Sequence, residues 1–161
     1  MPQRLIARLD AVLNALAMAL VLILLGVVAA GIVSRGVNRP FGWTDELSGV
    51  LMVWLAATGW MIATRRGSHI RIMLLLGMLR GDKRRAAERV ISACLAVLGA
   101  ALAWNAAILI RSNADVEIIS LPFSSAWLYV PLLPAGLVTA IQALADLASP
   151  PAKSARETAF P

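Results

Sequence analysis

The sequence has very little of the chemistry that most enzymes and metal proteins need. Among its 161 residues there is one cysteine, Cys94, and one histidine, His69. A single cysteine excludes an intrachain disulfide, a thiolate metal cluster and a Cys-x-x-Cys redox pair. A single histidine excludes a haem held by two histidines. We therefore expect no metal and no cofactor, with Cys94 as a small apolar side chain and His69 as a hydrogen-bonding residue at a membrane boundary.

Charged residues are also scarce, because they make up 15% of the chain whereas 60% of it is hydrophobic. A hydrocarbon core about 30 Å thick needs roughly 20 apolar helical residues to cross it, and a soluble fold would leave too much apolar surface in water. We therefore predict an all-α integral membrane protein with one four-helix domain at residues 1–149. Its spans are expected at about 11–34, 46–65, 90–110 and 124–148.

The first apolar run could also belong to a signal peptide, because Arg4 and Arg8 precede it. A secretory apolar region is shorter, at about 7–15 residues. The run at 11–34 continues past the small residues Ala29 and Ala30, so we expect a retained span.

The basic residues predict the orientation of the helices. Most of the 15 lysines and arginines lie near the amino terminus, in the link at 65–89 and in the carboxyl-terminal tail. Short loops rich in lysine and arginine face the cytoplasm, so we expect both termini and this link to be cytoplasmic. The formal net charge of +6 is then a topology signal, and we expect no nucleic-acid partner.

Two cytoplasmic segments lie outside the predicted spans. Residues 72–79 are uncharged but give only about 12 Å of helix, too little to span, so we predict a short interfacial helix there, between the second and third spans. Nearby arginines and lysines are expected to contact phospholipid headgroups. Residues 150–161 are polar and interrupted by proline, which predicts a flexible cytoplasmic tail.

Several residues inside the spans suggest helix–helix contacts. Small residues four positions apart let helices approach closely in lipid, and they form two stripes, Gly26, Ala30 and Ser34 in the first span and Gly99, Ala103 and Ala107 in the third. The indole N–H of Trp54 needs a partner in the membrane interior. Asn105, beside Trp104, is expected to hydrogen-bond to a neighbouring helix. Pro131 and Pro134 predict a kink in the last helix.

The order of these residues resembles that of a known family. The pattern comprises Arg35, Asn38-x-Pro40, Trp43-x-x-Glu46, Trp54, Gly59, Arg65-Arg66-Gly67-x-His69-Ile70, Trp104, Leu121-Pro122 and Trp127-Leu128-x-x-Pro131-x-x-Pro134. It is similar to the small membrane subunit of tripartite ATP-independent periplasmic (TRAP) transporters, the DctQ/SiaQ-like family, from about Leu9 to Ala148. One departure is Met73, where the family often has an acid.

The resemblance implies a non-catalytic subunit of a secondary transporter in the bacterial inner membrane. Its partners would be a large DctM/SiaM-like membrane subunit, which moves sodium and substrate by an elevator motion, and a periplasmic protein that delivers an organic acid. The small subunit would be a scaffold. We expect its contacts with the partner subunit or with lipid to use Trp43, Glu46, Trp54, Gly59, Arg65, His69, Trp104, Asn105 and Pro134.

Two other classes of function are open at this point. An independent four-helix exporter acting as a homodimer would need a glutamate well inside a span, and the nearest, Glu46, lies at the edge of one. A membrane enzyme or electron carrier would need the paired cysteines or histidines that the chain lacks. No span carries a charged residue near its centre, where an ion or substrate pathway usually has one.

Overall fold

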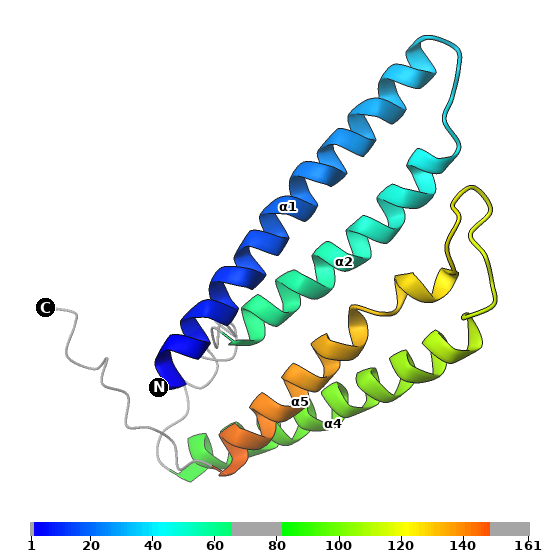
Figure 1. Cartoon of the computed structure of the whole chain (residues 1–161). Coiled ribbons are helices and arrows are strands. Elements are labelled where there is room, and N and C mark those ends of the chain that lie inside the picture. The colour runs from blue at the N-terminus through cyan, green and yellow to red at the C-terminus, as the bar shows by residue number, and fades with distance from the viewer. Residues whose placement is uncertain (1, 66–81, 149–161) are drawn as a thin grey trace, which may run out of the picture.

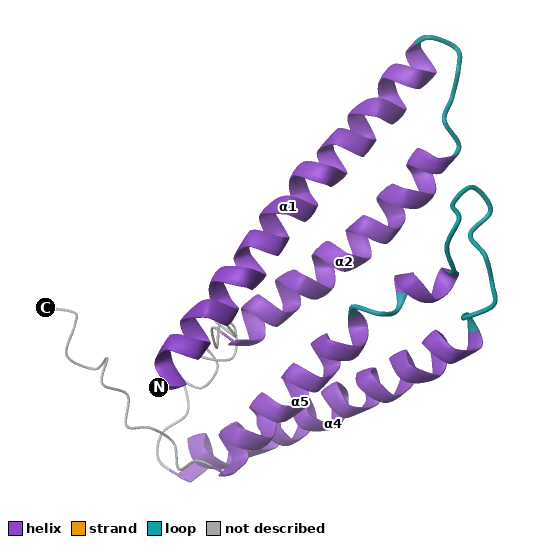
Figure 2. Cartoon of the chain, in the orientation of Figure 1, coloured by secondary structure: helices purple, strands orange, loops and turns teal. Residues whose placement is uncertain are grey.

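The computed structural model describes residues 2–65 and 82–148. The expected interfacial helix at 72–79, His69 and the tail at 150–161 lie outside the described residues. The described part consists of α1 (Pro2–Gly36), α2 (Trp43–Arg65), α4 (Asp82–Ser112), the 3₁₀ helix η1 (Ser125–Leu128) and α5 (Leu132–Ala148). Figure 2 shows helices joined by loops, with no strand in the described ranges.

Four segments of the described chain are long and apolar enough to cross a membrane. They are Arg8–Gly36, Trp43–Arg65, Ala86–Ser112 and Ser125–Ala148. This confirms the predicted all-α class with four candidate spans. Many large apolar side chains are exposed along these segments, including Leu22 and Val97, which are 69% and 70% exposed. Such surfaces are stable only in lipid or against another protein.

The helices form two hairpins that lie side by side (Figure 1). α1 packs on α2, and α5 packs on α4. Among the described elements, the hairpins meet only where α2 contacts α5 and η1. The resulting order is α1, α2, α5, α4, so α1 and α4 are the two outermost helices. We call the end that carries the 37–42 turn and the 113–124 loop the loop end of the molecule.

Glycines allow the backbones of α4 and α5 to pack in direct contact. A Cβ atom added to Gly99 would lie 2.6 Å from the Ala140 nitrogen, and one added to Gly136 would lie 2.6 Å from the Ala103 nitrogen. Side-chain carbons do not approach backbone atoms so closely, so each position must be glycine for the helices to sit at this distance. Ala106, one turn further along α4, is 2% exposed.

The hairpin of α1 and α2 is closed by a capped turn. The N–H of Asn38 donates to the carbonyl of Arg35, and the N–H of Arg39 donates to the carbonyl of Ser34. Asn38 has a φ of 57°, which asparagine tolerates better than most residues. This bonding pattern is the Schellman motif, which satisfies the last carbonyls of a helix. It ends α1 and turns the chain towards α2.

The last span differs from the single kinked helix expected over 124–148. It consists of η1, a turn and then α5, which begins at Leu132. Pro131 has no N–H to donate and its ring blocks a continuing helix, so the chain restarts there. Pro134 lies in the first turn of α5, where a missing N–H costs no intrahelical bond.

The buried interior is small and made mainly of small side chains. Its centre is Ala57, Met61 and Ala135, packed against Leu13, Leu132 and Val138. Thr58 of α2 is 1% exposed, and its hydroxyl donates to the Trp54 carbonyl at 2.8 Å. The interior therefore lies along α2, on the sides of this helix that face α1 and α5.

Candidate functional site

Contacts of the helix α2 with η1, α5 and the 113–124 loop join the two hairpins, and we call this region the α2–α5 seam. Three α2 side chains, those of Glu46, Trp54 and Trp60, cross the seam with hydrogen bonds. They are spread from the loop end towards the opposite end of α2. Two of them, Glu46 and Trp54, are candidate residues from the sequence, so the α2–α5 seam is the candidate functional site.

Glu46 holds the 113–124 loop against α2. Its Oε2 atom accepts a hydrogen bond from the Ser120 backbone N–H at 2.8 Å and a second from the Ser120 hydroxyl at 2.5 Å. Hydrogen bonds to a carboxylate are stronger than bonds between neutral groups. Within the loop, Ser124 accepts from the Ala126 N–H and donates to the Asn113 carbonyl at 2.6 Å. The loop is therefore fixed both to α2 and to itself.

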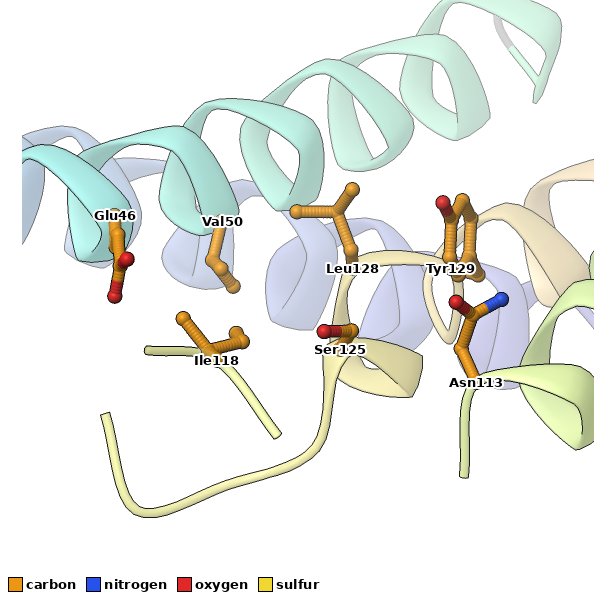
Figure 3. Close-up of a pocket in the computed structure, with 7 residues that line it drawn as sticks. All are labelled: Glu46, Val50, Asn113, Ile118, Ser125, Leu128 and Tyr129. Atoms are coloured by element: carbon orange, nitrogen blue, oxygen red, sulfur yellow. The ribbon is translucent and has the colours of Figure 1, made fainter. Parts of the chain in front are cut away.

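A pocket of about 330 Å³ lies beneath this loop (Figure 3). In the figure, Glu46 and Val50 point from α2 towards Ile118, while Asn113 and Tyr129 lie together at the other end. The full lining is Glu46, Val50, Asn113, Ile118, Ser125, Leu128 and Tyr129. Glu46 supplies the only carboxylate of this lining, and that carboxylate already accepts two hydrogen bonds from Ser120.

Trp54 forms a hydrogen bond to the other hairpin. Its indole N–H donates to the backbone carbonyl of Trp127 at 2.9 Å. The two indole rings are also stacked, with centroids 6.0 Å apart and planes 24° from parallel. Trp127 belongs to η1, and the residue four positions further along the chain is Pro131. Because proline has no N–H, the Trp127 carbonyl has no i+4 donor and is available to the indole of Trp54.

Trp60 makes a third contact that the sequence did not single out. Its indole N–H donates to the Thr139 hydroxyl at 2.9 Å, and that hydroxyl donates to the Ala135 carbonyl at 2.8 Å. Thr139 is 3% exposed. The same reasoning that flagged Trp54, an indole N–H within an uncharged run, applies to Trp60 and could have found it.

Ion pairs join α1 to α2 at both ends of their hairpin. At the loop end, the guanidinium of Arg35 reaches both carboxylate oxygens of Asp45, at 2.5 and 2.6 Å. At the opposite end, Nε of Arg65 lies 3.3 Å from a carboxylate oxygen of Asp10. The Arg65 side chain is 18% exposed, whereas Arg35 and Asp45 are 60% and 68% exposed. The Asp10 side chain is 43% exposed, so the Arg65 pair is partly buried, whereas the Arg35 pair is open to solvent, where ion pairs contribute little.

Several other candidate residues are exposed and do not join the seam. Trp43 stacks on Phe41, with ring centroids 6.0 Å apart. Nothing lies within 4 Å of a Cβ atom built on Gly59. Pro134 is exposed in the first turn of α5. Trp104 is 72% exposed on α4, and the Asn105 amide donates to the Ala101 carbonyl of its own helix at 2.8 Å.

The two small-residue stripes lie in different surroundings. Gly99 and Ala103 lie directly against α5, as described above, and Ala107 is half-buried. In the first stripe, Ser34 is 2% exposed, but nothing lies within 4 Å of a Cβ atom built on Gly26. The close approach of α1 to α2 is instead at Gly31, where an added Cβ would lie 3.1 Å from the Thr44 hydroxyl.

The described residues hold no group of three or more histidine, cysteine or acidic side chains that could bind a metal ion. Their polar side chains instead make contacts between helices, both at the seam and within each hairpin. These features define a multi-pass helical membrane protein whose polar contacts fix one helix against another.

The family follows from comparison with known proteins. The sequence model of the family described as "Tripartite ATP-independent periplasmic transporters, DctQ component" matches residues 24–150. The chain belongs to this DctQ family and is the small membrane subunit of a TRAP transporter. A search of curated proteins found no match. The family membership implies a large membrane partner and a binding protein in the assembled transporter.

Proposed function

We propose that this chain is a non-catalytic scaffold that pairs with the large elevator-type subunit of its transporter and holds it in the inner membrane. The family match supports this proposal. The observation that carries it is the extended row of helices. Four helices laid side by side, with α2 and α5 in the middle, bury little of their own surface. Such a row suits a protein that covers the side of a larger membrane protein.

The polar contacts of the chain are consistent with a static part of the transporter. The seam is bridged by Glu46 near the loop end, Trp54 further along and Trp60 beyond it. A part that moves substrate needs two arrangements of comparable free energy, and hydrogen bonds spread along one seam favour a single arrangement. Motion would then belong to the large subunit.

The proposal includes the orientation and the substrate class. Both termini lie in the cytoplasm, as the basic link and tails favour, so the loop end faces the periplasm and the binding protein. The large subunit carries an organic acid inward with sodium. Headgroups of phospholipids contact the basic residues at the cytoplasmic side.

Co-purification from cells that express both membrane subunits tests the pairing. With an affinity tag on this chain, we expect the large subunit to co-elute in a fixed ratio after extraction in mild detergent. We also expect deletion of the chain to abolish uptake. Purification of the tagged chain alone, together with normal uptake in the deletion strain, would refute the scaffold role.

A further inference from the structure

Asn105 differs from every other exposed side chain described within the spans. Across residues 11–33, 47–64, 90–110 and 132–145, it is the only exposed side chain with an amide, a hydroxyl or a charge. It lies five residues inside the end of the uncharged run at 110, about 7 Å along the helix axis. It is therefore a polar group within the hydrocarbon region.

The hydrogen bonds of Asn105 are incomplete. Its Nδ2 atom donates to the Ala101 carbonyl at 2.8 Å, and its Oδ1 atom accepts no hydrogen bond from any described residue. An amide oxygen without a donor is costly in hydrocarbon. Polar side chains at such positions commonly join membrane helices to one another, so the geometry calls for a donor from another molecule.

The surroundings of Asn105 suit a protein neighbour. Gly99 and Ala106 of α4 face α5, and the opposite side of the helix is exposed. We call this exposed side the α4 edge and define it as Cys94, Val97, Ala101, Trp104, Asn105 and Ile108. Ala101 and Cys94 are small, which lets a second helix approach. Trp104, at 72% exposure, offers a large surface beside them.

α1 is the outermost helix at the other end of the row (Figure 1). Every exposed side chain of α1 between residues 11 and 33 is apolar. Met18, Leu22 and Leu25 are 63%, 69% and 65% exposed. Long aliphatic side chains without polar groups suit lipid tails. The two outer edges of the row therefore differ, and only the α4 edge carries a group that lipid tails cannot satisfy.

We propose that the α4 edge docks against a transmembrane helix of the large subunit, which places a hydrogen-bond donor against Oδ1 of Asn105. The donor is a hydroxyl, amide or indole N–H. This inference rests on the proposed function, because it names the surface through which the scaffold holds its partner. The α1 edge faces lipid in the same assembly.

Matched substitutions on the two edges test the inference. Ala101→Leu adds bulk at the centre of the α4 edge, Asn105→Leu removes the amide, and Ala29→Leu is the control because Ala29 is exposed on α1. In the co-expressed complex, we expect Asn105→Leu to lower the co-purified large subunit by about fivefold, the effect of one lost interhelical hydrogen bond. We expect Ala101→Leu to lower it as well, because the larger side chain keeps a partner helix from approaching closely. Ala29→Leu should leave the yield unchanged.

The results separate this inference from the proposed function. If wild-type chain co-purifies with the large subunit and both α4 variants do so equally well, the docking surface is elsewhere and the scaffold role stands. If the wild-type chain itself never co-purifies, the proposed function fails first.

Cys94 provides an independent readout because it is the only cysteine of the chain and is exposed on the α4 edge. A benzophenone attached to Cys94 in membranes that contain the complex should crosslink to the large subunit on illumination. A Cys94→Ala chain that carries Ala29→Cys, labelled in the same way, should not. Crosslinks from Cys94 to a second copy of this chain, or to lipid alone, would overturn the inference.

Discussion

At the residue scale, Trp54 is the side chain whose structural role was easiest to anticipate from the sequence. A mid-span indole needs an acceptor, and the sequence shows that need. Pro131 leaves the Trp127 carbonyl without an i+4 donor, but the sequence does not show that η1 packs against α2, so it does not identify this carbonyl as the acceptor. The same limit applies to Asn105, whose expected bond to a neighbouring helix is replaced within this chain by a bond to its own helix.

We expect Trp54→Phe to destabilise the isolated chain by at least about 1 kcal/mol, because the hydrogen bond to Trp127 is lost while a smaller aromatic ring remains to stack on it. Unfolding in mixed micelles, followed by fluorescence or circular dichroism, measures this free energy. Trp104→Phe is the matched control, since Trp104 is exposed, and it should change the value little. Equal effects of the two substitutions would show that the Trp54 bond contributes nothing.

The hydrogen bonds from Ser120 to Glu46 lead to a prediction about the 113–124 loop. We expect Glu46→Ala to speed amide hydrogen exchange at Ser120 about tenfold or more, because a bond from an N–H to a carboxylate is lost. Exchange followed by mass spectrometry of loop peptides measures it. Asp45→Ala is the control, since that neighbouring carboxylate pairs with Arg35. Unchanged exchange in Glu46→Ala would mean that the loop is held without Glu46.

At the scale of elements, close helix packing was partly visible in the sequence. The four-residue spacing of Gly99 and Ala103 indicated a helix contact. Gly136 and Ala140, with the same spacing on α5, lie against them. Gly26 has the same spacing to Ala30, but a Cβ atom built on Gly26 has no described neighbour within 4 Å. A stripe of small residues shows that a close approach is sterically possible, and only the arrangement of the helices decides which stripe is used.

Gly136→Ala tests this packing directly. The added Cβ would lie 2.6 Å from the Ala103 nitrogen and 2.8 Å from the Gly99 carbonyl oxygen, so α4 and α5 must move apart. We expect a loss of about 1–3 kcal/mol in the unfolding free energy of the isolated chain. Gly26→Ala, which meets nothing within 4 Å, should be neutral or slightly stabilising. A stable Gly136→Ala variant would contradict the packing described.

The last span shows why element boundaries are harder to predict than element existence. The uncharged run and its prolines indicated a kinked helix, and the existence of a span was right. Two prolines three residues apart can either bend one helix or end one and begin another. The choice depends on whether the released backbone groups find partners, and here the Trp127 carbonyl finds the indole of Trp54.

At the scale of the whole molecule, the number of spans and the family could be predicted from sequence, whereas the order of helices in the row could not. Charge-free runs count spans because lipid excludes charge. The order α1, α2, α5, α4 depends on contacts between distant residues, such as Trp60 with Thr139. Only that order shows that α1 and α4 are outermost and that their exposed surfaces differ.

The central claim is that this chain supports transport without carrying substrate itself. The most direct measurement is sodium-driven uptake by proteoliposomes that contain the large subunit and the loaded binding protein, with and without this chain. We expect uptake only when the chain is present, and unchanged uptake with the control substitution Ala29→Leu at an exposed position of α1. Full uptake by the large subunit alone would contradict the account.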